Sequence, residues 1–486
     1  MKAVISIGLM ALALSGCATR RAVSIDCPQF QSFAIDVPPT AIIRAIQSDV
    51  PVQSGEIFSD EAIQDFLIQG SGRVIFDQHL KQLQRRRLAK SNAPGLRAQA
   101  IVSDDMTALL LSGGGQWGAF GAGYMEELSR QQPSALPTVK FVTGVSTGAL
   151  QSLYVAANQA DAGKNWLADM RRHYSPQSEG EIVDRGSFLS ALFTGSVAGL
   201  APLRRKIETA LCSSGEGASL QCPLIDALAL EDAPLVLIGF VEARSGKMQF
   251  VLVQEIATAP IAPSEKQQCL AGAALASVAM PLHFQQVQIR STPKGNPAAP
   301  LEAVTYYDGG VRQSVFFVLT DKIMAALARN DQAADRSGNA GATPSGDLPR
   351  TAYILRNGPT TAPLDQEVDQ TASGLKAALR GYQLIVNQSE IASIAAMRPT
   401  FPAVDLFVAT ADGHDRAGGF KDPRPEIERQ GAQSETLRCQ KGTGKRKDMM
   451  FDPDFMRCLR AYGRFKANMT GDGRENGWVA IPDKAP

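Results

Sequence analysis

One turn, which carries a serine between two glycines, constrains this chain of 486 residues more than any other feature. Residues 139–143 form an apolar, β-branched run that is typical of a buried strand. The motif Gly144-x-Ser146-x-Gly148 follows directly, and an alanine-rich helical pattern begins after it. Glycines leave room for a sharp chain reversal. The pattern predicts strand, tight turn and helix, with Ser146 at the apex where a serine nucleophile is presented. An ordinary strand-to-helix turn is the alternative.

A second glycine-rich loop precedes this turn. Residues 107–112 are continuously apolar, as in a buried parallel strand, and residues 119–131 have a helical pattern. Between them lie the glycines of the loop, Gly113, Gly114, Gly115 and Gly118. Two successive strand-loop-helix units imply neighbouring parallel strands. Both loops should therefore open at the same edge of the sheet, where such proteins place their sites.

The glycine-rich loop has more than one interpretation. It lacks the Gly-Lys-Ser/Thr of a phosphate-binding P-loop. Gly113, Gly115 and Gly118 match a dinucleotide-binding pattern, but no convincing acidic residue follows about 20 positions later. Successive backbone N–H groups without side chains can also form an oxyanion hole, and a serine one unit later favours that interpretation. A close strand-helix packing turn is the remaining alternative.

The N-terminus has the pattern of an export signal. Met1-Lys2 is followed by an apolar stretch, residues 3–14, that is too short to span a bilayer. The sequence around Cys17 resembles a bacterial lipobox, which implies cleavage before Cys17 and lipidation of its thiol. We therefore expect a chain anchored by lipid in the bacterial cell envelope, at the outer membrane facing the periplasm. No other segment approaches 18 uninterrupted apolar residues, so the rest is expected to be soluble.

Six cysteines remain if Cys17 is lipidated, and an even number in an exported chain suggests disulfides. Six cysteines allow 15 connectivities, so the sequence alone does not decide the pairing. Proximity along the chain favours the pairs Cys212–Cys222 and Cys439–Cys458, which leaves Cys27–Cys269. Zinc binding is disfavoured because no C-x-x-C pair occurs, and we expect no metal or other cofactor.

Charge gives no reason to expect a nucleic-acid partner. The chain has 49 Lys and Arg against 48 Asp and Glu, a net charge of +1. The lipid anchor predicts a membrane as one partner, and protein partners remain open.

Further patterns complete the chain. A hairpin is expected over residues 235–254, a helix over 266–280, and a strand over 303–307 that runs into Asp308-Gly309-Gly310. Further elements are expected at 316–330, 352–355, 375–397 and 405–409, and residues 331–350 have the composition of a mobile surface insertion. The apolar segment 185–202 either touches lipid or forms a core helix.

The glycine loop, Gly144-x-Ser146-x-Gly148 and Asp308-Gly309-Gly310 occur in the order found in patatin-like phospholipases. The stretch Ala276-Ser277-x-x-x-Pro281, between the last two, resembles a further block of that family. The resemblance extends over roughly residues 107–315. It implies a three-layer α/β/α sandwich with a mainly parallel central sheet. It also implies a Ser–Asp dyad rather than a triad.

The resemblance assigns roles to named residues. Ser146 would attack the acyl ester of a lipid, Asp308 would act as the base, and Gly113, Gly114 and Gly115 would form the oxyanion hole. The implied function is a membrane-anchored serine hydrolase of the phospholipase A or lysophospholipase kind, with an acyl lipid as substrate. The family usually has a basic residue where this chain has Trp117, which leaves the substrate class open and makes Trp117 a candidate for lining an acyl site.

Two other functions are compatible with the sequence. An α/β-hydrolase would need a Ser146–Asp308–His414 triad, and His414 is the only histidine after Asp308. That histidine lies in a polar stretch, which suggests an exposed loop. A non-catalytic lipid-binding or envelope-organising lipoprotein with an inactive hydrolase fold is the second alternative.

The expected organisation has four parts. Residues 1–16 form the signal peptide, and 17–104 a tether with a helical region. Residues 105–410 form the catalytic domain, and 411–486 a polar extension held by a disulfide.

Overall fold

The computed structural model describes residues 22–37, 107–161, 163–186, 196–213, 220–318, 351–362, 374–400, 404–427, 435–442, 446, 449–471 and 473–482. The predicted signal peptide, Cys17, nearly all of the expected tether and the insertion at 331–350 lie outside these residues. Within the described part of the chain, no helix is long and apolar enough to cross a membrane.

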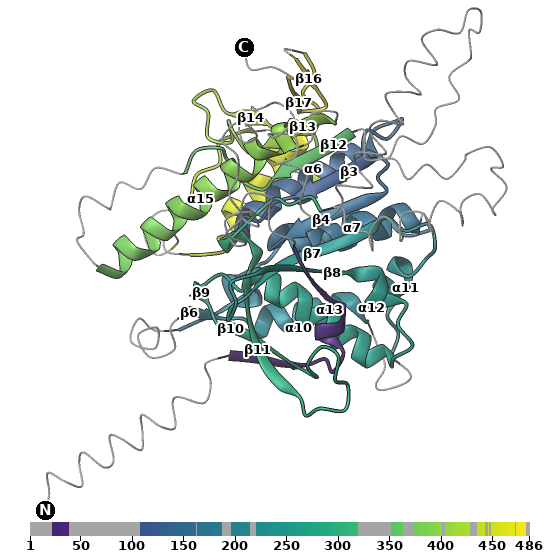
Figure 1. The fold of residues 1–486 in the computed structure, drawn as a ribbon. Coiled ribbons are helices and arrows are strands. Elements are labelled where there is room, and N and C mark those ends of the chain that lie inside the picture. The colour runs from purple at the N-terminus through teal and green to yellow at the C-terminus, as the bar shows by residue number, and fades with distance from the viewer. Residues whose placement is uncertain are drawn as a thin grey trace, which may run out of the picture.

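A large sheet forms the centre of the molecule (Figure 1). Its five middle strands are parallel, in the order β7, β4, β3, β12 and β13. They comprise Leu235–Glu242, Phe141–Val145, Thr107–Leu111, Thr351–Arg356 and Asp405–Thr410. In the β3–β4 pair Leu111 lies opposite Gly144, so the glycine loop and the serine turn leave the sheet side by side. The predicted parallel neighbours are confirmed.

Antiparallel strands extend the sheet on both sides of this parallel centre. Beyond β7 lie β11, β10 and β1, of which β1 pairs with β10 in parallel. Strand β8 also pairs with β7, and β2 pairs with β8. In the order named here from β11 to β2, these strands comprise Glu302–Asp308, Gln286–Ser291, Ala22–Asp26, Met248–Leu252 and Ala34–Asp36. Beyond β13 lie β17 (Trp478–Ile481) and β16 (Arg474–Glu475). The predicted hairpin is the β7–β8 pair.

The register of these strands places two motifs that are far apart in the sequence at the same height in the sheet. Val145, the last residue of β4, lies opposite Gly239 of β7, and Asp308 at the end of β11 lies opposite Phe240. Ser146 and Asp308 therefore leave the sheet at nearly the same height, although they are far apart in the sequence.

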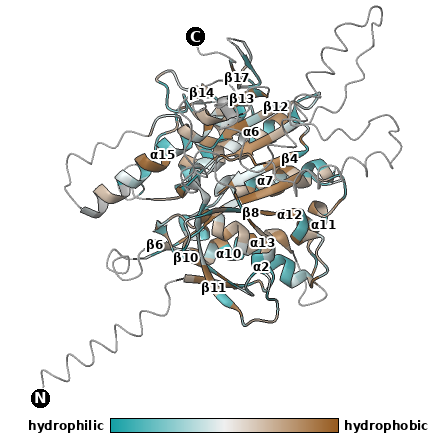
Figure 2. Cartoon of the chain, in the orientation of Figure 1, coloured by the Kyte–Doolittle hydropathy of each residue, from teal (hydrophilic) through white to brown (hydrophobic). Residues whose placement is uncertain are grey.

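Helices cover both faces of the sheet, which gives the three-layer α/β/α fold expected from the sequence. Alternate residues of β3 divide between two cores, with Leu109 and Leu111 in one and Ala108 and Leu110 in the other. The first core contains residues of α6, α7, α13 and α16 (Gly118–Arg130, Thr147–Ala160, Pro263–Val278 and Pro453–Ala467). The second contains residues of α15 (Gly374–Thr400). Figure 2 shows the hydrophobic colour concentrated along these inner strands and helices.

Smaller helices and 3-10 turns complete the first layer around α7. They are α8 (Trp166–His173), η3 (Glu179–Glu181), α10 (Ala201–Leu211), α11 (Pro223–Leu228) and α12 (Val253–Ala257). The short helix α2 (Phe30–Phe33) lies between β1 and β2. The described residues contain three disulfides, Cys27–Cys269, Cys212–Cys222 and Cys439–Cys458, and these are the pairs expected above.

Three expectations from the sequence need correction. Residues 22–37, expected in the tether, instead form β1, α2 and β2, and both strands pair within the large sheet. In segment 185–202, Arg185 ends β5 (Asp184–Arg185), and β6 (Ser196–Gly199) pairs with β5. Helix α10 begins only at Ala201, so the core-helix interpretation is wrong for residues 185 and 196–199. The helix expected from 316 does not begin there, because residues 316–318 are not helical. The rest of that expected helix lies outside the described residues.

The C-terminal extension packs on the domain instead of standing apart from it. Helix α16 lies against α6 so closely that a Cβ on Gly463 would be 2.2 Å from the Phe120 carbonyl oxygen. A Cβ on Gly123 would be 2.2 Å from the Arg460 carbonyl oxygen. Glycines on both helices therefore permit a backbone-to-backbone approach, and β17 adds the same extension to the sheet.

Candidate active site

Ser146 has a strained backbone at the apex of the turn between β4 and α7. Its φ is 55° and its ψ is −124°, a region that non-glycine residues rarely adopt. A Cβ on Gly148 would lie 2.3 Å from the Leu111 carbonyl oxygen, and one on Gly144 would lie 2.3 Å from the carbonyl oxygen of Gly148. Both motif glycines are thus required sterically, because neighbouring backbone leaves no room for a side chain.

A buried hydrogen bond from a distant helix supports the turn. The Ser146 N–H donates to Ser277 Oγ at 2.8 Å, and Ser277 Oγ donates to the Gly239 carbonyl oxygen at 2.6 Å. Ser277 lies near the end of α13 and is fully buried. The Ala276-Ser277 block noticed in the sequence therefore holds the nucleophile turn against β7.

The glycine-rich loop lies directly beside the nucleophile. A Cβ on Gly113 would be 3.3 Å from Ser146 Cβ and 3.9 Å from its Oγ. Gly114 has a φ of 144°, and a Cβ there would be 2.0 Å from the carbonyl oxygen of Asn357. Among the described hydrogen bonds, the N–H groups of Gly113 and Gly114 have no acceptor. These donors can therefore serve an oxyanion that forms at Ser146.

Polar residues behind this loop fix its shape. Asn357 Nδ2 donates to the Ser112 carbonyl oxygen at 2.9 Å and to Gln151 Oε1 at 2.8 Å, and Ser112 Oγ donates to the Gly113 carbonyl oxygen at 2.7 Å. All three polar side chains are buried. No local sequence pattern indicates this network, because Asn357 follows β12, more than 200 residues after the loop it supports.

Asp308 ends β11 as a buried carboxylate, with 1% of the residue exposed. Its Oδ1 accepts a hydrogen bond from the Gly310 N–H at 2.7 Å, and its Oδ2 is buried without a hydrogen-bond partner among the described residues. A Cβ on Gly309 would lie 2.9 Å from Val145 Cγ1, so the base turn packs directly against the strand that leads to Ser146. One carboxylate oxygen is therefore left available for chemistry.

Burial raises the pKa of Asp308 to about 7. The hydrogen bond from Gly310 and the nearby Ser146 hydroxyl lower this pKa, and the negative charge of Glu390 on α15 raises it. The Ser146 hydroxyl is thus close enough to the carboxylate to affect its pKa, although the hydrogen bonds of the described residues do not include one between these two side chains. A carboxyl group that titrates near neutral pH is suited to general-base chemistry.

Glu390 belongs to a buried ion pair behind the site. Its Oε2 lies 2.9 Å from Nη2 of Arg356, the last residue of β12, and both side chains are almost fully buried. Arg356 Nη2 also donates to Asn387 Oδ1 at 2.9 Å. Helix α15 therefore places a paired charge near the base, an arrangement with no signature in the sequence.

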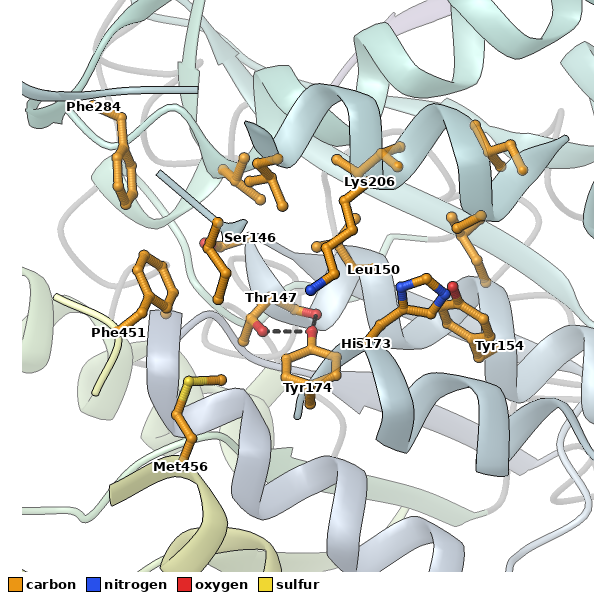
Figure 3. Close-up of a pocket in the computed structure, with 18 of the residues that line it drawn as sticks. Ser146, Thr147, Leu150, Tyr154, His173, Tyr174, Lys206, Phe284, Phe451 and Met456 are labelled. Atoms are coloured by element: carbon orange, nitrogen blue, oxygen red, sulfur yellow. Dashed lines mark hydrogen bonds between the residues drawn. The ribbon is translucent and has the colours of Figure 1, made fainter. Parts of the chain in front are cut away.

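An apolar pocket begins at Ser146 and runs between α7 and α10 (Figure 3). Its cavity volume is about 90 Å³, which is below the ~300–1,000 Å³ range of small-molecule sites. Leu150 and Tyr154 of α7 and Leu203 and Ile207 of α10 are among the residues that line it. The pocket has the composition expected for an acyl chain.

A few polar groups also reach the pocket. Lys206 of α10 lies 3.4 Å from Glu181 Oε2, and burial together with the charges of Lys206 and Arg172 lowers the pKa of His173 to about 4. His173 is therefore neutral at physiological pH. The Tyr174 hydroxyl is already used, because it donates to the Thr147 carbonyl oxygen at 2.9 Å.

The C-terminal extension contributes to the same pocket. Phe451 and Met456 line it together with Ser146, and Phe451 stacks on Phe284 with ring centroids 6.2 Å apart. Sequence reasoning missed these two residues, because nothing in a polar, charged stretch marks which side chains face a site in another part of the chain.

Trp117 does not line this pocket. Its ring packs edge-on against the rings of His414 and Phe455, with centroids 4.8 and 5.1 Å away. The next residue, Gly118, packs against Thr147. The candidate acyl-site role of Trp117 is therefore wrong for the pocket described here, and the residue instead joins the glycine loop to α16.

His414 is not the exposed loop residue that its polar neighbours suggest. Only 12% of its side chain is exposed, and its Nδ1 lies 3.1 Å from the carbonyl oxygen of Ala411. Burial lowers its pKa. Among its described contacts, none reaches Ser146 or Asp308. The described residues also contain no group of three or more His, Cys, Asp or Glu side chains that could hold a metal ion.

Comparison with known proteins agrees with this geometry. No match was found among curated proteins. A family model described as patatin-like phospholipase matches residues 109–320, which include the glycine loop, Ser146 and Asp308. Members of that family are lipid acyl hydrolases. Residues 109–320 of this chain thus match the patatin-like phospholipase family.

Proposed function

We propose that this protein is a serine acyl hydrolase that cleaves ester-linked acyl chains from lipids, using Ser146 as the nucleophile and Asp308 as the base. One observation carries the proposal: a strained serine lies beside free backbone N–H groups and a buried carboxylate, at the start of an apolar pocket. The lipobox resemblance around Cys17 supports a lipid anchor in the bacterial envelope, which would hold the enzyme at its substrate's surface.

The first half of the proposed reaction forms an acyl-enzyme. Asp308 Oδ2 accepts the proton of the Ser146 hydroxyl as Oγ attacks the ester carbonyl carbon. The resulting oxyanion receives hydrogen bonds from the N–H groups of Gly113, Gly114 and Gly115, and the positive end of α7 lies under it. Collapse of this intermediate breaks the ester C–O bond, and the departing alcohol takes the proton from Asp308.

The second half releases the acyl chain. Asp308 accepts a proton from water as the water oxygen attacks the acyl-enzyme carbonyl. The same N–H groups stabilise the second oxyanion. Collapse then breaks the bond to Ser146 Oγ, which regains its proton from Asp308, and a carboxylic acid leaves. One residue thus acts in turn as base and acid, for which a pKa near 7 is suitable.

Hydrolysis of acyl esters by the full-length protein in detergent tests this proposal. We expect 4-nitrophenyl esters and short-chain lysophospholipids to be cleaved, and Ser146→Ala to abolish cleavage while circular dichroism is unchanged. Ser245→Ala, in an exposed turn between β7 and β8, is the matched control and should retain wild-type activity. Failure of the folded wild-type protein to cleave any ester would favour a non-catalytic lipid-binding role.

His414→Ala separates the dyad from a triad. Because the described contacts of His414 lie with Trp117, Phe455 and Tyr462, we expect its ester hydrolysis to stay within a few-fold of the wild type. A loss comparable to that of Ser146→Ala would require a histidine in the mechanism.

A further inference from the structure

The pocket at Ser146 has a wall that the family match does not cover. Residues 449–456 supply Phe451 and Met456 to its lining, whereas the matched region ends at residue 320. Both side chains are buried, with 8% and 1% of the residue exposed. A part of the chain that no family motif describes therefore bounds the space next to the nucleophile.

Hydrogen bonds fix the backbone of this wall on two sides. The N–H groups of Met450 and Phe451 donate to Glu179 Oε1 at 2.5 and 3.3 Å, and the Asp452 N–H donates to Gln116 Oε1 at 3.1 Å. Gln116 lies in the glycine-rich loop, and both accepting side chains are buried. Shifts of the wall are thus resisted by buried partners that would otherwise be left unsatisfied.

Helix α16 and a disulfide support the wall from behind. The Asp452 side chain caps α16 by accepting hydrogen bonds from the N–H groups of Asp454 and Phe455. The Cys439–Cys458 bridge ties the first half of the helix to the preceding segment. These connections make the wall a fixed part of the site.

The wall lies on one side of the nucleophile and the apolar arm on the other. In Figure 3, Ser146 lies between the Phe284–Phe451 pair and the residues Leu150 and Tyr154. From Thr147 to Tyr154, α7 advances seven residues, or roughly 10 Å. With ~1.5 Å carbon–carbon bonds in zigzag, that length corresponds to an extended chain of about eight carbons. The lining residues of α7 therefore extend over the length of a medium acyl chain.

A lipid ester at Ser146 would place its acyl chain in this arm and its alcohol portion against the aromatic pair. A second acyl chain, attached to the alcohol portion, would have to pass the stacked rings of Phe284 and Phe451. We propose that residues 449–456 form a selectivity wall, and that Phe451 in this wall favours single-chain esters over two-chain lipids. This inference rests on the proposed function of Ser146.

Two lipids with the same headgroup and acyl length test the wall. The full-length protein in detergent is assayed on 1-octanoyl-lysophosphatidylcholine and on dioctanoyl-phosphatidylcholine, and the ratio of the two kcat/KM values is measured. We expect the wild type to prefer the single-chain lipid about tenfold or more, and Phe451→Ala to move the ratio several-fold toward one. Because the headgroup is constant, its charge does not affect the ratio.

Glu179 gives a second test that does not change the lining. Glu179→Ala removes the acceptor of two backbone N–H groups of the wall and should move the ratio in the same direction. Glu179→Gln keeps an acceptor oxygen and should retain the wild-type ratio. Leu203→Ala, in the acyl arm, should change preference among acyl lengths without changing this ratio.

The possible results distinguish a failure of the selectivity wall from a failure of the proposed catalytic function of Ser146. Equal or faster hydrolysis of the two-chain lipid by the wild type, or an unchanged ratio in folded Phe451→Ala, would overturn the selectivity wall while leaving Ser146 hydrolysis intact. If neither lipid nor 4-nitrophenyl octanoate is cleaved in a Ser146-dependent manner, the proposed function itself fails.

Discussion

The nucleophile turn and the base turn are adjacent in space, but they are held in different ways. At Gly144–Gly148 the backbone determines the geometry: Ser146 has a φ of 55°, and glycine backbone contacts leave no alternative path. At Asp308–Gly310 the backbone is ordinary, and the unusual feature is a buried carboxylate with one unpartnered oxygen. Backbone strain therefore positions the nucleophile, whereas burial raises the pKa of the base.

Both arrangements cost stability, and the two costs depend differently on pH. Backbone strain at Ser146 is independent of pH, and it amounts to roughly 1–3 kcal/mol for a residue in such a region. The cost of Asp308 appears only when its carboxylate must be charged. Variants at the two turns should therefore show different pH signatures.

The largest expected effect is the loss of catalysis on neutralising the base. Asp308→Asn keeps an oxygen that can accept from Gly310 but cannot take a proton, so kcat should fall by roughly 10³-fold or more. In the wild type, kcat/KM should rise with pH through about 7, because the base works only when deprotonated. Steady-state rates from pH 5 to 9 check both points. A profile that is flat between pH 5 and 8 would contradict a base with this pKa.

The next effect is on stability. The pKa of Asp308 is raised to about 7 from an ordinary 3.8, so between pH 4 and 7 the folded state binds more protons than the unfolded state. The unfolding free energy should therefore fall as pH rises through that window. Asp308→Asn lacks this loss and should be more stable than the wild type at pH 8, by roughly 2–4 kcal/mol, with the difference vanishing near pH 4.

Urea unfolding at pH 4.5, 6 and 8 measures this difference. The exposed substitution Asp232→Asn is the matched control, for which no comparable gain is expected. A gain of the same size at all three pH values would mean that packing, not charge burial, separates the Asn variant from the wild type.

A smaller effect is expected from the hydrogen bond that supports the nucleophile turn. Ser277→Ala leaves the buried Ser146 N–H without its acceptor, which should cost about 1–3 kcal/mol of unfolding free energy and lower kcat. Ser152, which is buried on α7 and donates only to the Ala149 carbonyl oxygen of its own helix, provides the control Ser152→Ala. Equal kcat values for Ser277→Ala and Ser152→Ala would show that the Ser277 hydrogen bond does not determine the geometry of the nucleophile turn.

The smallest effect isolates the backbone strain. Ser146→Gly and Ser146→Ala both remove the nucleophile, but only glycine adopts a φ of 55° at low cost. The Gly variant should be more stable than the Ala variant by about 1 kcal/mol at every pH, after the greater freedom of glycine in the unfolded chain is allowed for. Thermal unfolding of the two inactive variants checks this, and a more stable Ala variant would rule out strain at Ser146.

The difference between the two turns also decides how much of the site could be predicted from the sequence. The turn around Ser146 was predictable because side chains at its two glycines would clash with the nearest strand and helix. Such contacts between adjacent elements require glycine at fixed positions, which leaves a local pattern in the sequence. The parallel β3–β4 pair follows from two successive strand-loop-helix units. For Asp308, the sequence identified the residue through its Asp-Gly-Gly motif but did not indicate its pKa, which depends on burial and on Glu390 of α15.

Long-range contacts explain what was missed. Asn357 fills the space that Gly114 leaves open, although the two residues are more than 200 positions apart. Phe451 completes the pocket at Ser146 from more than 300 positions away. His414 was expected in an exposed loop because its neighbours are polar, but the ring of Trp117 and helix α16 cover it. Spacing along a chain carries no information about such neighbours.

Fluorophosphonate labelling of the full-length protein tests whether Asp308 activates Ser146. We expect one adduct, located by mass spectrometry on the peptide that contains Ser146, with a labelling rate that rises through pH 7. The adduct should be absent in Ser146→Ala and should form far more slowly in Asp308→Asn. No adduct on the folded wild-type protein, or an undiminished rate in Asp308→Asn, would contradict this activation.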